Sequence, residues 1–252
     1  MAAYDIFLKN EHSGKVSQLM INNNKRLINY LCQKRKKAKI LEIGPGKGYF
    51  KQAAINTPPH VCKIEYYAVD RNENILANLN IDSKHTIVAE LPNINIKMKF
   101  DIIFVGYVIE HLSSGIDLYN AIANLKTLLK DNGILVLQFP DAMKLGMEFY
   151  NIDYTHTLPT TKRNVNQAIL DNDMYVKKAI DLCGILYTKK VDSSLQYFIK
   201  SKIMFFYSYN IANGLTKIIY HTPIWSLNNV FWRAYGLLKE PNVMFIVKKN
   251  SN

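Results

Sequence analysis

The chain has 252 residues, of which 48% are hydrophobic and 21% charged, and a net charge of +12. This length and balance indicate one large globular domain, and no stretch offers the ~18 uninterrupted apolar residues of a membrane-spanning helix. Charges near the start argue against a secretion signal, and the three scattered cysteines argue against a disulfide framework or a zinc site. We therefore expect a cytoplasmic protein whose excess positive charge favours partners with phosphate groups: nucleic acid, nucleotide-linked substrates or an anionic membrane surface.

The first 140 residues alternate between helical and strand patterns. Apolar residues at helical spacing predict a helix over about residues 15–35. Short apolar runs predict strands at 38–44, 64–70, 85–91, 101–107 and 132–140. Helices are predicted between them, at 48–56, 72–80 and 115–130. This alternation is typical of an α/β fold with a parallel sheet.

Beyond Pro140 the pattern changes. An irregular stretch is followed by a predicted helical segment over 163–184 and by a sixth strand at 185–194. Residues 197–238 are rich in aromatic side chains and predict a helical insertion, and a last strand is predicted at 242–249. We interpret the chain as a single domain of residues 1–252, with an N-terminal helical segment (1–37), a ligand-binding core (38–140) and an acceptor-side region (141–252).

The sharpest motif is ILEIGPGKGYF, residues 40–50, in which a predicted strand runs into Gly44, Gly46 and Gly48 and a helix follows. Glycines allow a tight turn and a close ligand approach, and the start of the helix offers free N–H groups. A dinucleotide fold would need its third glycine at position 49, which is Tyr49, and no Gly-Lys-Ser/Thr of a Walker loop follows. Glu42 stands two residues before the first glycine.

Acidic residues end the next two predicted strands. Asp70 ends the second, where a carboxylate can accept both hydroxyls of a ribose. Glu90 lies at the end of the third, placed to meet an adenine amino group. The fourth strand runs into VGYVIEHL, and LLKDNGILVLQFP supplies a helix, a turn and the fifth strand.

On these motifs the chain resembles the class I S-adenosylmethionine-dependent methyltransferases over residues 38–140. The resemblance implies a Rossmann-like, mostly parallel seven-stranded sheet with an antiparallel last strand. It also implies S-adenosylmethionine as cofactor, leaving as S-adenosylhomocysteine. The residues expected to bind it are Glu42, Gly44, Pro45, Gly46, Gly48, Tyr49, Asp70, Arg71, Glu90, Leu91, Gly106 and Tyr107.

Two acceptor types are disfavoured by missing signatures. Adenine and glutamine N-methyltransferases carry Asn/Asp-Pro-Pro-Tyr after the fourth strand, which this chain lacks, and none of its cysteines follows a proline as in cytosine C5 methyltransferases. An alcohol acceptor remains, and an alcohol needs a general base. His111 and His156 follow the fourth and fifth strands, whose carboxyl ends face the ligand crevice of such sheets.

The stretch DYTH, residues 153–156, resembles an element of bacterial methyltransferases of polysaccharide biosynthesis. We hypothesise that His156 accepts the proton of a sugar hydroxyl and that Asp153 orients it or binds a neighbouring hydroxyl. Glu110 and His111 complete the candidate catalytic set. An alternative mechanism would use a magnesium ion held by Glu110, His111, Asp141, Asp153 and His156. No metal-ligand spacing in the sequence requires such an ion, so no metal is assigned.

The expected activity is therefore O-methylation of a sugar, either nucleotide-linked or part of a bacterial capsule or lipopolysaccharide. The alternative activities are methylation of another small molecule and methylation of RNA. The basic residues are dispersed along the chain, which disfavours nucleic acid as a partner. The aromatic insertion is interpreted as a helical cap with a homodimer contact, and peripheral membrane contact stays open. The residues expected to contact phosphate are Arg71, Lys144, Lys162 and Arg163.

Overall fold

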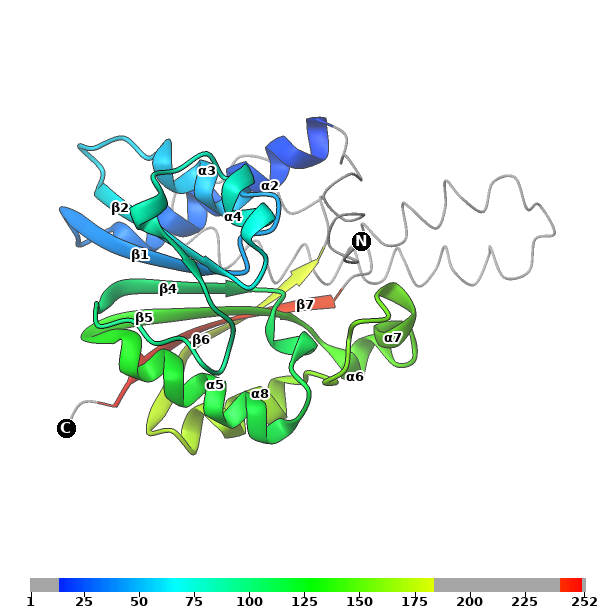
Figure 1. The fold of residues 1–252 in the computed structure, drawn as a ribbon. Helices are drawn as coiled ribbons and strands as arrows, with labels where there is room; N and C mark the ends of the chain where they lie inside the picture. The colour runs from blue at the N-terminus through cyan, green and yellow to red at the C-terminus, as the bar shows by residue number, and fades with distance from the viewer. Residues whose placement is uncertain (1–13, 184–240, 251–252) are drawn as a thin grey trace.

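Parallel strands form the centre of the protein. The computed structural model describes residues 14–183 and 241–250, which build a seven-stranded sheet in the order β3-β2-β1-β4-β5-β7-β6 (Figure 1). β7 is antiparallel to both of its neighbours, and β1 to β5 are parallel. The strands are β1 Lys37–Ile43, β2 Lys63–Asp70, β3 Thr86–Val88, β4 Phe100–Gly106, β5 Leu129–Pro140, β6 Met174–Cys183 and β7 Pro241–Lys249.

Helices cover both faces of this sheet. In Figure 1, α2 (Gly14–Cys32), α3 (Tyr49–Ile55) and α4 (Glu73–Asn78) lie on one face. α5 (Gly115–Leu128) and α8 (Lys162–Leu170) lie on the other. The short α6 (Ala142–Leu145) and α7 (Glu148–Ile152) lie beyond the carboxyl ends of the parallel strands, and the 3-10 turns are η1 (Ser83–His85) and η2 (Ile109–His111).

The core consists of two apolar layers, one on each side of the sheet. Successive residues of β1 point to opposite faces, so Ile40 packs in the layer of α2 and α3 while Leu41 packs in the layer of α5 and α8. Strands that are buried on both faces carry continuous apolar runs, which is why they could be predicted from sequence.

The expected fold class is confirmed, including the seven strands and the antiparallel last strand. The helix predicted over 163–184 is wrong in its second half, because α8 ends at Leu170 and a turn with Asp173 at φ 52° leads into β6. Residues 174–183 form an edge strand because β7 offers them a full antiparallel ladder, from Met174–Lys249 to Cys183–Pro241. Tertiary pairing of this kind overrides a local helical pattern.

Two strand boundaries also differ from prediction. β3 is only three residues long, so Glu90 lies in the loop beyond it, and β5 begins at Leu129 rather than Asn132. The sixth strand predicted at 185–194 and the insertion at 197–238 lie outside the described residues. The division into segments 1–37, 38–140 and 141–252 stays a prediction.

Two of the compositional expectations can be compared with the fold. Cys32 and Cys62 are buried free thiols in the layer of α2 and α3. Within residues 14–183 and 241–250, no helix has the length and apolar content that a membrane crossing requires.

Candidate functional site

The loop between β1 and α3 takes a shape that depends on glycine. Gly44 has φ 67°, and a Cβ atom there would lie 2.5 Å from Cγ2 of Val108, in the loop after β4. Its N–H donates to the carbonyl of Val69 (2.9 Å), at the end of β2. The glycine loop therefore touches the end of β2 and the loop that follows β4, and only glycine fits this approach.

The carboxyl of Glu42 lies beneath this loop. Its side chain is buried, accepts a hydrogen bond from the hydroxyl of Tyr66 on β2, and receives the backbone N–H of Lys51 in α3. Burial raises the pKa of Glu42 to about 8, although these two hydrogen bonds lower it. The structure thus places Glu42 as a support that ties the first turn of α3 to the sheet.

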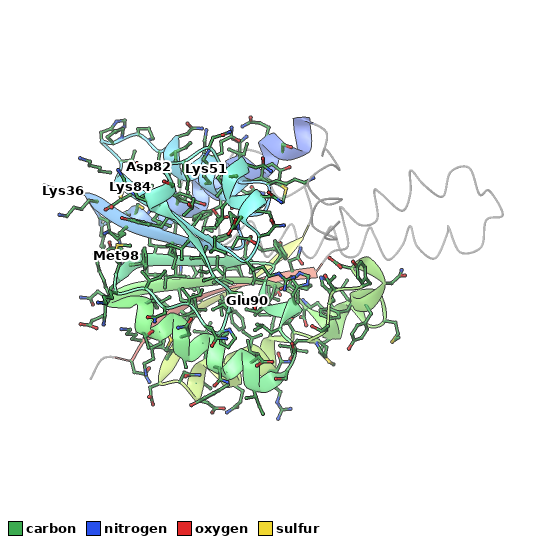
Figure 2. All side chains as sticks on the ribbon, in the orientation of Figure 1. Lys36, Lys51, Asp82, Lys84, Glu90 and Met98 are labelled. Carbon is green, nitrogen blue, oxygen red and sulfur yellow. The ribbon has the colours of Figure 1, made fainter. Side chains whose placement is uncertain are left out.

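Asp70 lies at the carboxyl end of β2, as expected. It is half-buried, its Oδ1 accepts the N–H of Asn72 (2.9 Å), and burial raises its pKa. The next residue, Arg71, reaches Glu90 with 3.7 Å between Nη1 and Oε2. Both side chains of this pair are mostly exposed, so it contributes little stability. Figure 2 shows Glu90 toward the carboxyl ends of the strands, away from Lys36 and Met98 at the amino ends.

The end of β4 carries two further residues of the predicted cofactor set. A Cβ at Gly106 would lie 2.9 Å from the ring of Phe104, and Tyr107 has φ 59° and an exposed ring. The N–H of Tyr107 donates to the carbonyl of Gln138 on β5 (2.8 Å). This bond fixes the point at which the chain turns toward Val108 and the glycine loop.

The predicted catalytic residues come together beyond β4 and β5. The N–H groups of Thr157 and Leu158 both donate to the carbonyl of Glu110, at 3.1 and 3.0 Å. The hydroxyl of Thr157 donates to the carbonyl of Leu112 (2.9 Å). These bonds join the stretch after α7 to η2 and so assemble a polar cluster, defined here as Glu110, His111, Asp153 and His156.

The two histidines of the polar cluster are held in the same manner. His156 Nδ1 lies 2.7 Å from the carbonyl oxygen of Phe149, and His111 Nδ1 lies 3.0 Å from that of Thr155. A carbonyl can only accept, so each Nδ1 carries a proton, and in the neutral form of each ring Nε2 carries the lone pair. Burial lowers the pKa of His111, which favours its neutral form. The two ring centroids are 5.1 Å apart.

Glu110 is the most enclosed member of the polar cluster. Its side chain is 1% exposed, and its Oε2 has no hydrogen-bond partner among the described residues. Burial raises the pKa of Glu110 to about 8, and the nearby charge of Asp153 acts in the same direction. A carboxyl in this position is costly to bury unless something completes its coordination.

Asp153 was expected to orient His156, but another group does so in the structure. The ring of His156 is oriented by the Phe149 carbonyl, whereas Oδ1 of Asp153 accepts the N–H (2.8 Å) and the hydroxyl (2.7 Å) of Thr155. Burial would raise the pKa of Asp153, but the Thr155 hydrogen bonds and the nearby His111 and His156 outweigh it and hold that pKa below its usual value.

Thr155 is a member of the site that sequence reasoning left unassigned. Its hydroxyl oxygen lies 3.0 Å from Nδ1 of His111, so it links Asp153 to His111. The spacing Asp-x-Thr was the available signal, because Asp side chains commonly accept the backbone N–H two residues on. Tyr66, the partner of Glu42, had no comparable local signal because it comes from a neighbouring strand.

The residues expected to contact phosphate are mostly engaged in ion pairs. Lys144 and Lys162 both pair with Asp181, and Arg163 is exposed. Asp141, included in the weighed magnesium set, instead caps α6 by accepting the N–H of Met143 (3.3 Å). Of the five residues in the magnesium set, those whose ligand atoms lie within 4.8 Å of one another, among the described residues, are Glu110, His111 and His156.

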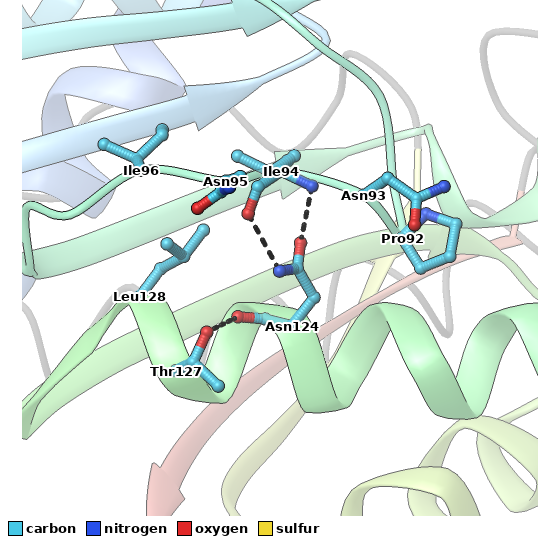
Figure 3. A pocket seen from close by; sticks show the side chains of 8 residues that line it. All are labelled: Pro92, Asn93, Ile94, Asn95, Ile96, Asn124, Thr127 and Leu128. Carbon is cyan, nitrogen blue, oxygen red and sulfur yellow. Dashed lines mark hydrogen bonds between the residues drawn. The ribbon is translucent and has the colours of Figure 1, made fainter.

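A shallow pocket on the α5 side offers no comparable chemistry. Asn124 bridges the backbone of Ile94 with bonds of 3.1 and 2.9 Å, and Thr127 donates to the carbonyl of Asn124 (Figure 3). Its lining contains no acid or base; the lining residues are Pro92, Asn93, Ile94, Asn95, Ile96, Asn124, Thr127 and Leu128. We regard it as a groove between a loop and a helix.

Comparison with known proteins agrees with this arrangement. Residues 17–168 match the family described as "Methyltransferase domain". No curated protein matches the sequence significantly. Among solved structures, a SAM-dependent methyltransferase from Archaeoglobus fulgidus has TM-score 0.55 and 18% identity, covering 99% of this chain and 100% of its own.

Two further solved structures share the fold. The N-methyltransferase NodS from Bradyrhizobium japonicum WM9, in complex with S-adenosyl-L-homocysteine, has TM-score 0.58 and 13% identity, covering 99% of this chain and 97% of its own. A complex between the Haloferax volcanii Trm112 methyltransferase activator and a putative methyltransferase has TM-score 0.61 and 10% identity, covering 100% and 99%. At these identities the likeness concerns the fold.

Proposed function

This chain belongs to the methyltransferase domain family and is an S-adenosylmethionine-dependent methyltransferase; from this we propose that it methylates a sugar hydroxyl. The observation that carries the proposal is the polar cluster beside the glycine loop. Val108, which meets the glycine loop at Gly44, stands two residues before Glu110 in the chain. A cofactor in the glycine loop would thus lie next to histidines with available Nε2 lone pairs.

We assign cofactor binding to the carboxyl ends of β1, β2 and β4. Gly44, Gly46 and Gly48 would receive the methionine part, with Pro45 and Tyr49 beside them, and Asp70 would accept the ribose hydroxyls. Arg71, Glu90 and Leu91 would line the adenine, and Gly106 and Tyr107 would close the β4 side. Glu42 supports this site from beneath, as its contacts with Tyr66 and Lys51 indicate.

Methyl transfer is an in-line displacement in which the sulfonium C–S bond breaks as the O–C bond forms. The enzyme must align the acceptor oxygen and take its proton. In this proposal His156 accepts the proton through the lone pair of Nε2, provided that no other ligand holds that nitrogen. Its ring is fixed by the Phe149 carbonyl. Asp153 lies nearby with its pKa held below its usual value, and Thr155 holds that carboxylate in place.

The acceptor class is supported by the surroundings of the polar cluster. Tyr150 is 45% exposed and Tyr154 is 80% exposed, and both stand in the stretch that carries His156. Aromatic rings of this kind suit the apolar faces of sugars. The net charge of +12 suits a nucleotide-linked sugar. A cytoplasmic location and a role in bacterial surface-glycan assembly belong to the same proposal.

The test is a panel of nucleotide-linked sugars incubated with the full-length protein and S-adenosylmethionine, read by mass for the gain of one methyl group. With an accepted sugar, His156→Gln should lower kcat by about 10²- to 10⁴-fold and leave cofactor affinity unchanged. His60→Gln, at an exposed site, is the control. Near-normal turnover in His156→Gln would remove the histidine from the chemistry. Exclusive methylation of RNA, with steeply salt-dependent binding, would overturn the sugar acceptor.

A further inference from the structure

We propose that Glu110, His111 and His156 form a binding site for a divalent transition-metal ion. One ligand atom from each of these three side chains lies within 4.8 Å of the others. Metal–ligand distances of about 2 Å place two ligands up to about 4 Å apart, so side-chain shifts of about 1 Å or less would bring these atoms onto one ion. The three residues come from two separate segments, η2 and the stretch after α7, which are clamped together by the carbonyl of Glu110.

The carboxylate of Glu110 supplies an independent observation. Its Oε2 is buried and has no hydrogen-bond partner in the described part of the chain. Buried polar atoms of native proteins are nearly always paired, so an unpartnered one calls for an explanation. A cation bound between Glu110 and the two histidines would provide the missing partner.

The histidines are prepared for metal binding by their outer contacts. In each ring Nδ1 donates to a backbone carbonyl, that of Phe149 for His156 and that of Thr155 for His111. Ligating histidines typically donate their second N–H to a carbonyl or carboxylate, which fixes the tautomer and the ring orientation. The remaining nitrogen, Nε2, then carries the lone pair that a metal takes.

The composition of the site selects the kind of ion. Two imidazole nitrogens and one carboxylate suit ions such as Zn²⁺, Fe²⁺ or Co²⁺, whereas Mg²⁺ and Ca²⁺ prefer oxygen ligands. Asp141 and Asp153 lie outside the group of side chains whose ligand atoms converge; Asp141 caps α6, and Asp153 accepts from Thr155. Three protein ligands leave coordination positions open for a substrate oxygen.

The substrate on which the ion would act is taken from the proposed function, so this part of the inference rests on it. A sugar hydroxyl bound at an open position would be acidified by the ion, releasing its proton to water, and the alkoxide would then displace the sulfonium sulfur. The same lone pair of His156 cannot hold the ion and accept the proton. Metal binding would therefore replace His156 as base.

The test uses the full-length protein, treated with EDTA, desalted and titrated with Co²⁺ and with Zn²⁺, with no cofactor or acceptor present. We expect one tight equivalent per chain by elemental analysis and a Co²⁺ visible spectrum that Zn²⁺ abolishes. Glu110→Gln and His156→Asn should each weaken binding at least about 100-fold, while His60→Asn should bind like the wild type. No stoichiometric binding, or unchanged binding in both cluster variants, would overturn the proposal.

A second measurement on the wild type covers variants that fail to fold. On ¹⁵N-histidine-labelled protein, Zn²⁺ should shift the ring resonances of two of the six histidines at one equivalent. Shifts of one, or of more than two, would contradict the site. Failure of the metal site and failure of the proposed function can be told apart. Sugar methylation without metal binding would refute the metal site alone, and metal binding without an accepted sugar would refute the proposed function alone.

Discussion

Replacing Glu42 by glutamine should make the stability of the fold less sensitive to pH. The carboxyl is buried and its pKa is raised to about 8, against an ordinary value of 4.5. Between these values the folded chain keeps the proton and the unfolded chain releases it. The free energy of unfolding therefore falls as pH rises: the contribution is complete below pH 4.5 and lost as pH passes 8.

The size of the effect follows from the difference between the two pKa values. A span of 3.5 units, from 4.5 to about 8, multiplied by about 1.36 kcal/mol per unit, gives at most about 5 kcal/mol. Glutamine keeps one acceptor oxygen for these donors but carries no titrating proton. The difference in unfolding free energy between Glu42→Gln and wild type should thus grow in favour of the variant by about 1.4 kcal/mol per pH unit between pH 5 and 8.

Urea unfolding from pH 5 to 9, with EDTA in every sample, measures this difference. Glu65→Gln is a matched control: Glu65 lies on β2 and accepts from the Tyr67 hydroxyl, but it is exposed, and that hydrogen bond lowers its pKa. A lowered pKa stabilises the fold above the ordinary value and loses that effect only as pH falls, so Glu65→Gln should run parallel to wild type above pH 6. Parallel curves for Glu42→Gln as well would refute the reasoning.

Three further variants test the site. Gly44→Ala adds a Cβ 2.5 Å from the Val108 side chain, at a residue whose φ is 67°. It should weaken S-adenosylmethionine binding at least about tenfold by calorimetry. Gly115→Ala, where the added Cβ meets open space, should leave that binding unchanged. Asp70→Asn should weaken cofactor binding by about 10- to 100-fold, and equal affinities would remove its ribose role. Thr155→Val removes the hydroxyl donor to Asp153 and keeps the backbone N–H donor, and it should lower kcat by about tenfold with KM for the cofactor unchanged. A normal kcat would show that Asp153 does not need the hydroxyl.

The parts that sequence predicted well are those written in one continuous segment. The glycine loop, the acid Asp70 at the end of β2 and the order of alternating strands are local patterns, and the fold they imply is confirmed. The stretch around His156 could be placed at the carboxyl edge of the sheet because it follows β5. Its proximity to Glu110 and His111 follows from that topology.

The parts that sequence could not predict depend on partners that are distant in the chain. The sequence around His156 does not show whether Asp153 or the Phe149 carbonyl orients its ring. The turn of α7 brings the Phe149 carbonyl to Nδ1 of His156. The unpartnered Oε2 of Glu110 is likewise a property of packing. The strand β6 was mistaken for helix because its register is supplied by β7, which lies more than fifty residues later.

The pairing of Cys183 with Pro241 also bears on how such a protein can diversify. The chain leaves the sheet after β6 and re-enters it at β7 at two paired positions, so residues 184–240 begin and end at neighbouring points. Since Pro140 pairs with Asn242, those points lie at the edge where β5 leads toward the polar cluster. Exchanging the residues between these two positions would leave the order and register of β5, β7 and β6 unchanged. A segment that is joined to a sheet at two paired strand ends can therefore vary in length and sequence without a change in the sheet itself.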